Sequence, residues 1–217
     1  MAAGDGFRMA HWVLPLKFPK EATIVIPAGA VDILKLLWQK TPRTLPAGAD
    51  SLIPVVTAKK HASIALDAEK KGLRFTFGEA ATAFVKLVQG SPPDFVKLIP
   101  TTEPQMVASV IGAELDRAVR RVRNIAKESS GIVRMVFNND TATISARGNG
   151  HNAESSIKVM TVKGGANRVA LNSKYLLDYL KGKEGIVTIT ITQEGAPVGF
   201  RYQKAPTVLI MPMHVEW

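Results

Sequence analysis

The sequence predicts an α+β fold built from a repeated unit, in which a strand leads directly into an amphipathic helix and three further strands follow. Three observations support this fold class. The unit can be read three times along the chain, turn-forming residues separate its strands, and small or polar residues stand at the helix ends. Because strands joined by tight turns pair in antiparallel fashion, we expect antiparallel sheets with the helices packed against them.

The three copies share one order of elements. In the first copy, the strand, the helix and the three following strands are expected at Ala22–Ile26, Ala28–Lys40, Ala62–Leu66, Leu73–Phe77 and Thr82–Val88. In the second copy they are expected at Met106–Ile111, Glu114–Lys127, Ile132–Phe137, Thr141–Ala146 and Glu154–Thr161. In the third copy they are expected at Arg168–Leu171, Ser173–Lys181, Ile186–Thr192, Val198–Tyr202 and Thr207–Met211.

Residues that favour turns and helix ends separate these elements. Hairpin loops are expected at Lys70–Gly72, Asn138–Asp140 and Glu194–Gly195. Ser173 is expected to cap the N-terminus of the third helix, and Gly182 is expected to end that helix. The loop from Thr41 to Pro54 is rich in Pro and Gly, so we expect it to form a surface excursion.

The composition argues against several kinds of site. The chain has no cysteine, which excludes disulfides, thiolate metal sites and a cysteine nucleophile, and which favours a reducing cytoplasm. Its histidines are dispersed without metal-ligand spacing, and no Ser-His-acid, phosphate-loop or dinucleotide pattern is apparent. No apolar run reaches the length of about 20 residues that crosses a bilayer. We therefore expect a cytoplasmic protein with no membrane partner, cofactor, metal or catalytic centre.

The net charge indicates the class of partner. Lys and Arg number 28 against 18 Asp and Glu, a formal charge of +10. Residues 1–100 hold 13 basic and 8 acidic residues, which leaves 15 and 10 for residues 101–217, so each part carries +5. Such a surplus attracts a polyanion without any base-specific contact. Nucleic acid is the first candidate partner, and a merely soluble surface is the alternative.

The expected helix Glu114–Lys127 separates apolar from basic side chains. At 3.6 residues per turn, its inward face carries Leu115, Ala118, Val119, Val122 and Ala126. The remaining surface carries the candidate DNA-binding residues Arg117, Arg120, Arg121, Arg123 and Lys127. Acidic residues occur only near the first turn, where the helix dipole favours them. Further candidates for phosphate contacts on the other two helices are Lys35, Lys174 and Lys181.

Four short blocks of the sequence resemble one protein family. In chain order they are Asp5–Ala10, Pro93–Pro100, Leu171–Leu177 and Val208–Met213. They are similar to the Asp-Gly-His-Arg-Leu-Ala strand, the segment before the last domain, the Asn-x-x-Tyr-Leu-Leu helix start and the Met-Pro-Met final strand of the bacterial DNA polymerase III beta subunit, the sliding clamp. Phe7 replaces the usual His, Gly4 the usual Thr, and Pro197 stands where small polar residues are common.

The resemblance implies a DNA-clamp fold, with helices that face duplex DNA and antiparallel sheets outside. A clamp binds DNA without sequence preference, performs no chemistry, and serves the polymerase as a processivity factor. The resemblance also implies a groove that captures short apolar peptides from the replicative polymerase, the clamp loader and repair proteins, and methionines suit such a groove because they repack easily. The groove residues would be Gly6, Arg8, Met9, Pro93, Leu98, Asn172, Tyr175, Leu209, Met211, Pro212 and Met213.

The resemblance also implies how the chain is divided. Two repeats make one clamp domain, and full-length members carry three domains and form a ring oligomer. Residues 1–100 would then hold the end of a middle domain, with residues 7–16 as the third strand of a fourth repeat, and residues 101–217 a complete last domain. We therefore expect an N-terminally truncated clamp. The alternatives are a stand-alone two-domain clamp that closes as a trimer, and a basic nucleic-acid-modifying enzyme, which would need a titratable cluster in a pocket.

Overall fold

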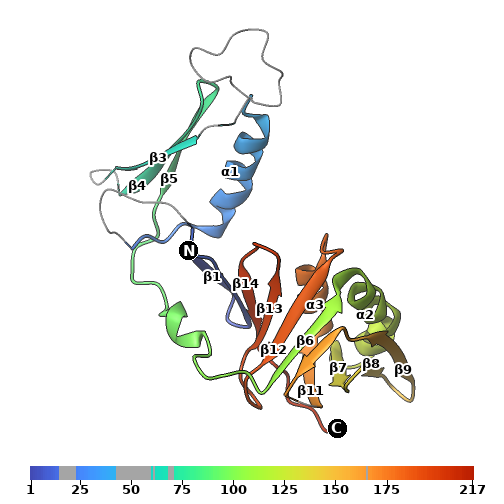
Figure 1. Ribbon diagram of the computed structural model, residues 1–217. Helices are drawn as coiled ribbons and strands as arrows, with labels where there is room; N and C mark the ends of the chain where they lie inside the picture. Colours follow the sequence, from blue (N-terminus) through green and yellow to red (C-terminus); the bar gives the residue numbers. More distant parts are fainter. Residues whose placement is uncertain (15–22, 43–59, 61, 68–70, 165) are drawn as a thin grey trace, which may run out of the picture. The chain divides into compact units, whose positions relative to one another are not determined.

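A computed structural model of the chain describes residues 1–14, 23–42, 60, 62–67, 71–164 and 166–217. These residues form two compact units (Figure 1). Unit 1 consists of Met1–Leu16 together with Asp94–Trp217, and unit 2 consists of Lys17–Pro93. Within the described residues, none of the helices is long and apolar enough to cross a membrane. The division into family domains at residue 100 stays a prediction. The compact units are defined by contacts within the chain, and they do not test how the repeats are grouped into domains.

Unit 1 contains most of the strands. They are β1 (Ala2–Gly4), β2 (Arg8–His11), β6 (Met106–Ile111), β7 (Ile132–Phe137), β8 (Thr141–Arg147), β9 (Asn152–Lys158), β10 (Thr161–Lys163), β11 (Asn167–Asn172), β12 (Ile186–Ile191), β13 (Val198–Tyr202) and β14 (Thr207–Ile210). The helices of unit 1 are the short 3-10 helix η2 (Phe95–Leu98), α2 (Gly112–Lys127) and α3 (Ser173–Leu180).

Two antiparallel sheets organise unit 1. The larger sheet has the order β1-β2-β14-β13-β12-β6-β10, and the smaller has the order β11-β7-β8-β9. The register places Met9 of β2 opposite Leu209 of β14, so the two ends of the chain share one sheet. The lead strand of each repeat pairs with the first of the three strands of the other repeat, as β11 does with β7 and β6 with β12. The two repeats of unit 1 therefore interlock.

The core of unit 1 lies where its helices meet its sheets. Helix α2 packs on β7, β8 and β9 and also contacts α3, while α3 contacts β11 and β14 (Figure 1). Alternation along the strands supplies the apolar faces, as in β12, where every second residue is buried. The rings of Phe200 and Tyr179 meet at a centroid distance of 5.1 Å within this core. A single cluster of buried side chains thus joins both repeats of unit 1.

Local chemistry fixes the ends of the helices. Helix α2 begins at Gly112, whose backbone N–H donates to the carbonyl of Gly185 at 2.8 Å. A Cβ at Gly112 would lie 2.3 Å from the carbonyl oxygen of Lys183, so the close approach requires glycine. The N-cap of α3 is Asn172, whose Oδ1 accepts from the backbone N–H of Lys174 at 2.9 Å, and not Ser173 as predicted. Gly182 follows the helix with φ of +73°, as expected for a C-terminal stop.

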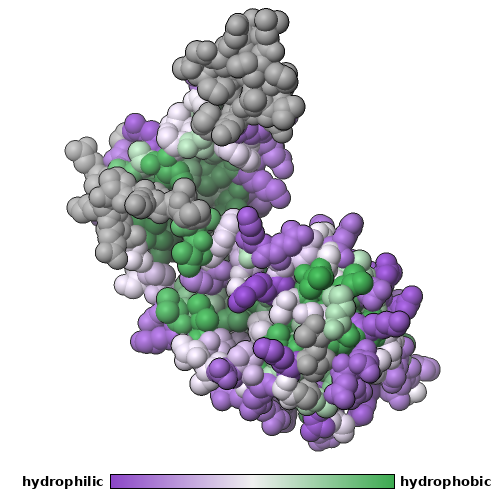
Figure 2. Space-filling model, in the orientation of Figure 1, coloured by the Kyte–Doolittle hydropathy of each residue, from purple (hydrophilic) through white to green (hydrophobic). Residues whose placement is uncertain are grey.

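Unit 2 is one helix on one sheet. Helix α1 (Ala28–Lys40) covers part of the antiparallel sheet β3-β4-β5, whose strands are Ala62–Asp67, Gly72–Phe77 and Ala81–Lys86. Leu34 and Leu37 of α1 pack against a small buried cluster that includes Phe75 and Phe77. Figure 2 shows apolar side chains that remain gathered at the surface of this unit. The core of unit 2 is therefore much smaller than that of unit 1.

The structure confirms the α+β class, the antiparallel sheets and the helix α1, and it corrects several elements. Residues 23–26 form no strand, and the backbone bond that Val25 O accepts from Val88 N–H lies two residues beyond the end of β5. Strand β9 ends at Lys158, because Val159 N–H donates to Asp140 O in the turn before β8, whereas Met160 N–H donates to Ser109 O of β6 in the other sheet. Of the strand expected at residues 7–16, the part that the structure describes, residues 7–14, is a strand only at Arg8–His11, and β1, β10 and η2 were not predicted. Most of the expected loop at 41–54 lies outside the described residues.

Candidate functional site

The basic side of α2 has the predicted division of faces. All five apolar residues expected to face inward are buried. Of the candidate DNA-binding residues, Arg117, Arg120, Arg121 and Lys127 are exposed, while Arg123 is partly buried. The exposed cations lie within four turns of one helix, so they can contact successive phosphates of a regular polyanion.

One acidic residue holds an arginine of this face in place. Arg120 Nε donates to Asp116 Oδ2 at 2.6 Å, and Arg120 Nη2 donates to Asp116 Oδ1 at 3.1 Å. The hydrogen bonds and the charge of Asp116 raise the pKa of Arg120. The spacing of four residues is the ordinary one for an ion pair on a helix. Asp116 therefore orients the Arg120 guanidinium and also neutralises part of its charge.

A groove of about 330 Å³ lies between α2 and α3, and most of its polar lining is basic. Its lining residues are Arg120, Arg123, Lys174, Leu177, Asp178 and Lys181. The structure thus brings together two candidates from α2 with Lys174 of α3 and Lys181, which directly follows α3. Within the described residues, the buried Nε of Arg123 has no hydrogen-bond partner. Lys35, the remaining candidate, is exposed on α1 in unit 2.

A second constellation surrounds Arg8, next to the turn between β1 and β2. Arg8 Nε lies 2.8 Å from Asp5 Oδ2, and Arg8 Nη1 lies 2.8 Å from Asp178 Oδ2 on α3. The guanidinium carbon of Arg8 stands 4.6 Å from the centre of the Tyr175 ring. Phe7 stacks on the same ring at a centroid distance of 6.1 Å. Asp5, Phe7 and Arg8 therefore fasten the turn, including Gly6, to the first turns of α3.

The Met-Pro-Met segment continues this constellation beyond β14. Met211 N–H donates to the carbonyl of Phe7 at 2.8 Å, and Met213 N–H donates to the carbonyl of Ala170 at 2.8 Å. Pro212 stands between these two bonds and has no N–H to satisfy. The segment thus spans from the β1–β2 turn to β11, next to Asn172 at the start of α3. Leu98 is exposed on η2, and Pro93 is the last residue of unit 2.

Ionisation strengthens the contacts of Arg8. Burial opposes the charge of Asp5, but hydrogen bonds from Arg8 and from the backbone N–H groups of Phe7 and Arg8 outweigh it, and the pKa of Asp5 is lowered. The hydrogen bond with Asp5, followed by that with Asp178, raises the pKa of Arg8. Ionised Asp5 therefore favours the folded turn.

An Asp5→Asn variant tests this contribution by its dependence on pH. Since the pKa of Asp5 is lowered in the folded state, its stabilising effect is present above the ordinary value of 3.8 and is lost as the pH falls through the lowered value. We expect the variant to melt below the wild type at neutral pH, and the gap in Tm to close at acidic pH. An Arg8→Gln background should shrink the gap at neutral pH. A gap that does not change with pH would contradict the assigned role.

Sequence reasoning missed Asp178 and Asp5 as partners of Arg8. On α3, Asp178 has the helical spacing of an ordinary partner for Lys174, and nothing in the sequence connects it with a residue 170 positions away. The pair of Asp116 and Arg120, in contrast, follows from their spacing. Asp5 stands three residues before Arg8, which is a local signal that sequence reasoning left unused.

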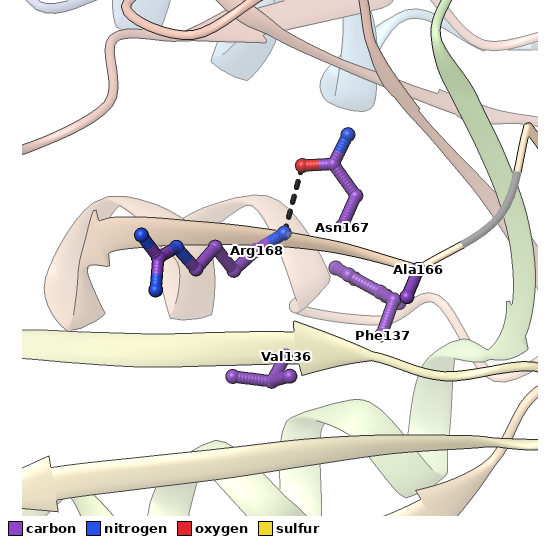
Figure 3. Close-up of a pocket in the computed structure, with 5 residues that line it drawn as sticks. All are labelled: Val136, Phe137, Ala166, Asn167 and Arg168. Carbon is purple, nitrogen blue, oxygen red and sulfur yellow. Dashed lines mark hydrogen bonds between the residues drawn. The ribbon is translucent and has the colours of Figure 1, made fainter. Parts of the chain in front are cut away.

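A further pocket, of about 350 Å³, lies where β7 ends and β11 begins (Figure 3). Its lining residues are Val136, Phe137, Ala166, Asn167 and Arg168. Asn167 Oδ1 accepts from the backbone N–H of Arg168 at 2.7 Å, and the Arg168 guanidinium lies 4.8 Å from the centre of the Trp217 ring. The contact of Arg168 with Trp217 joins β11 to the C-terminal segment. Within the described residues, His, Asp and Glu side chains form no group that could hold a metal ion.

Comparisons with known proteins identify this arrangement. Residues 96–214 match the model of the DNA polymerase III beta subunit, C-terminal domain. The chain is similar to the sliding clamp of Pseudomonas aeruginosa (23% identity, TM-score 0.79, 99% of this chain and 54% of that one). It is also similar to the beta subunit of Thermotoga maritima (17%, 0.82, 99% and 54%) and to the Bacillus subtilis clamp (20%, 0.79, 99% and 53%).

The chain thus spans about half the length of these solved clamps, and at such identities the likeness establishes the fold. A search of curated protein sequences finds no match. The family match covers more than half of the chain and includes both α2 and the Met-Pro-Met segment. The chain therefore belongs to the DNA polymerase III beta subunit family, and its residues 96–214 match that family's C-terminal domain.

Proposed function

We propose that the chain is a sliding clamp in the cytoplasm, which tethers a replicative polymerase and other partners to duplex DNA and performs no chemistry itself. The observation that carries this proposal is the basic face of α2, continued by Lys174 and Lys181 across the groove to α3. Phosphate contacts from such a face position a protein on the duplex without reading its sequence. This property suits a protein that must move along DNA.

DNA binding tests this part of the proposal. We expect the chain to bind two duplexes of unrelated sequence with equal affinity, and the affinity to fall linearly with salt concentration on logarithmic axes. Fluorescence anisotropy of labelled duplexes at several salt concentrations measures both quantities. A strong preference for one sequence, or an affinity that does not respond to salt, would argue for a different function.

We further propose that the residues around Arg8 and the Met-Pro-Met segment bind short apolar peptides from partner proteins. Support comes from the way the β1–β2 turn, α3 and β14 converge there: Met211 and Met213 are hydrogen-bonded to Phe7 and Ala170, and Tyr175 contacts both Phe7 and Arg8. Met213 and Tyr175 are both partly exposed, so a peptide can reach them. Flexible methionines allow one surface to accept several peptide sequences.

A peptide with a Leu-Phe tail tests this surface. We expect binding with a micromolar Kd, on the order of 8 kcal/mol. Tyr175→Ala and Met213→Ala should each weaken it roughly tenfold, because each removes a large contact at the centre of the proposed site. Met160→Ala is the matched control, since Met160 is also exposed in unit 1 but lies between β9 and β10. Isothermal titration calorimetry measures all four proteins, and equal effects of the three substitutions would place the peptide elsewhere.

Clamps of this family form rings, and we propose that β9 takes part in such an assembly. Strand β9 stands at the edge of the smaller sheet, and among the described strands it pairs only with β8. The opposite edge strand, β11, is approached by the C-terminal segment through Met213 N–H. An unpaired edge of seven residues can accept a strand from a neighbouring subunit and so extend the sheet.

A further inference from the structure

Unit 2 exposes an unusually large apolar surface for a small unit. On α1 the side chains of Val31, Ile33, Leu36 and Trp38 are between 41 and 60% exposed. On β3, Ile64 is 45% and Leu66 51% exposed. Soluble proteins rarely leave large apolar side chains clustered in this way, and such clusters mark surfaces that another chain covers.

The two β3 residues lie on the inner face of the sheet. Ile64 stands directly opposite Phe75, and Leu66 directly opposite Leu73, across the antiparallel pair of β3 and β4. Residues directly opposite each other lie on the same face of a sheet. Phe75 and Leu73 are buried in the core that α1 covers, whereas Ile64 and Leu66 are not. Helix α1 therefore covers β4 and β5 but leaves the inner face of β3 open.

The apolar surface of α1 is likewise wider than the sheet β3-β4-β5 can cover. At 3.6 residues per turn, the partly buried stripe of α1 runs through Ala30, Leu34 and Leu37. Ile33 and Leu36 lie on one side of this stripe, and Val31 and Trp38 on the other. The polar residues Asp32, Lys35 and Gln39 occupy the remaining arc. An amphipathic helix that packed on a single sheet would need only the central stripe.

Unit 1 contains the same arrangement in its covered form. Strand β7 occupies the place of β3 in its repeat, and its inner residues Val133, Met135 and Phe137 are fully buried. Helix α2 itself contacts β7, a second helix packs beside α2, and β11 from the other repeat pairs with the edge of β7. In unit 2, β3 pairs only with β4 among the described strands. In unit 1, therefore, a second strand-helix-three-strand repeat completes the packing around such a face.

We propose that unit 2 of a second copy of this chain covers this surface. Two copies related by a two-fold axis each supply one repeat, so that their α1 helices pack side by side as α2 and α3 do in unit 1. Each helix then covers the open inner face of the partner's β3. The self-association is isologous, because the same residues, Ile33, Leu36, Ile64 and Leu66, serve both sides. It involves a surface distinct from β9, α2 and the Met-Pro-Met segment.

Substitutions at the exposed positions test the proposal. We expect the wild-type chain to be dimeric at micromolar concentration in sedimentation equilibrium. Leu36→Glu and Leu66→Glu should each raise the dimer dissociation constant by roughly 30-fold, because each places a charge in the buried centre of the interface. Val96→Glu is the matched control, since Val96 is an exposed apolar residue of unit 1. A monomeric wild type, or a dimer that both substitutions leave intact, would overturn the proposal.

Crosslinking gives a second readout that does not depend on the stability of the variants. The chain has no cysteine, so Leu36→Cys and Ile33→Cys each introduce a single thiol. A short bifunctional thiol crosslinker should join two copies through these positions and should not join them through Ser156→Cys on β9 when DNA is absent. Crosslinking at β9 without crosslinking at α1 would assign the dimer to ring assembly and refute the role of unit 2. Neither outcome alters the tests of DNA or peptide binding.

Discussion

Replacing Arg117, Arg120 and Lys127 together by alanine is expected to weaken binding to every duplex alike, by roughly tenfold or more at low salt. Each cation lost from a phosphate contact lowers the salt dependence by about 0.9 in log-log slope, so the triple variant should lose about 2.7. The three side chains are exposed on one face of α2, so their removal leaves its buried face intact. Anisotropy titrations over a range of salt concentrations measure both changes.

Two controls separate a specific contact from a general loss of charge. Lys163, Arg201 and Lys204 are exposed elsewhere on unit 1, and their replacement by alanine changes the net charge equally. We expect this second triple variant to keep most of the salt slope. Asp116→Asn should strengthen DNA binding, because it releases Arg120 from its ion pair. Equal losses of slope in both triple variants would remove α2 from the DNA interface.

Phe200→Ala is expected to destabilise unit 1 by about 3–5 kcal/mol, the usual cost of removing a large aromatic ring from a close-packed core. Phe200 is fully buried in β13, and its ring meets that of Tyr179 on α3, so the cavity would open where a helix joins the larger sheet. Amide hydrogen exchange measures the effect residue by residue and therefore reports each unit separately. Protection should fall throughout unit 1 and stay unchanged in β4 of unit 2.

Phe84→Ala is the matched control for this substitution. Phe84 lies on β5 of unit 2 and is nearly half exposed, so the same change should cost about 1 kcal/mol. If Phe200→Ala costs no more than Phe84→Ala, the helix and the sheet of unit 1 do not share one core.

The elements that the sequence predicted well are those whose signal is local. The helix at Ala28–Lys40 and the strands at Met106–Ile111 and Ile132–Phe137 have the predicted bounds, because hydrophobic periodicity and turn residues mark both of their ends. The strand expected at residues 22–26 was wrong in its described part. Its apolar residues fit a strand, but a strand also requires a partner along its length, and this requirement is invisible in a short stretch of sequence.

In the candidate site, too, the features with a local signal were predicted, and those that depend on distant contacts were not. The basic face of α2 followed from periodicity alone, because a helix of fixed pitch places its side chains predictably. The groove that joins α2 to α3, and the contact of Arg8 with Asp178, depend on how distant segments pack. The stack of Phe7 on Tyr175 was not expected either, since the family usually has His at that position. The resemblance to the clamp family indicated which residues belong to the site, whereas the structure was needed to show which of them are in contact.

The pairing of β2 with β14 has a consequence for how the protein is made. Arg8–His11 leaves the ribosome long before its partner strand Thr207–Ile210. Residues of unit 2 emerge in between and can fold while one edge of β2 is paired with β1 and the edge that will accept β14 is still open. Contacts between segments so far apart in sequence form slowly and leave apolar edges open in the meantime. Synthesis of this chain therefore calls for protection of the open edge of β2, and a pause before Thr207–Ile210 emerges would lengthen the period in which that edge can aggregate.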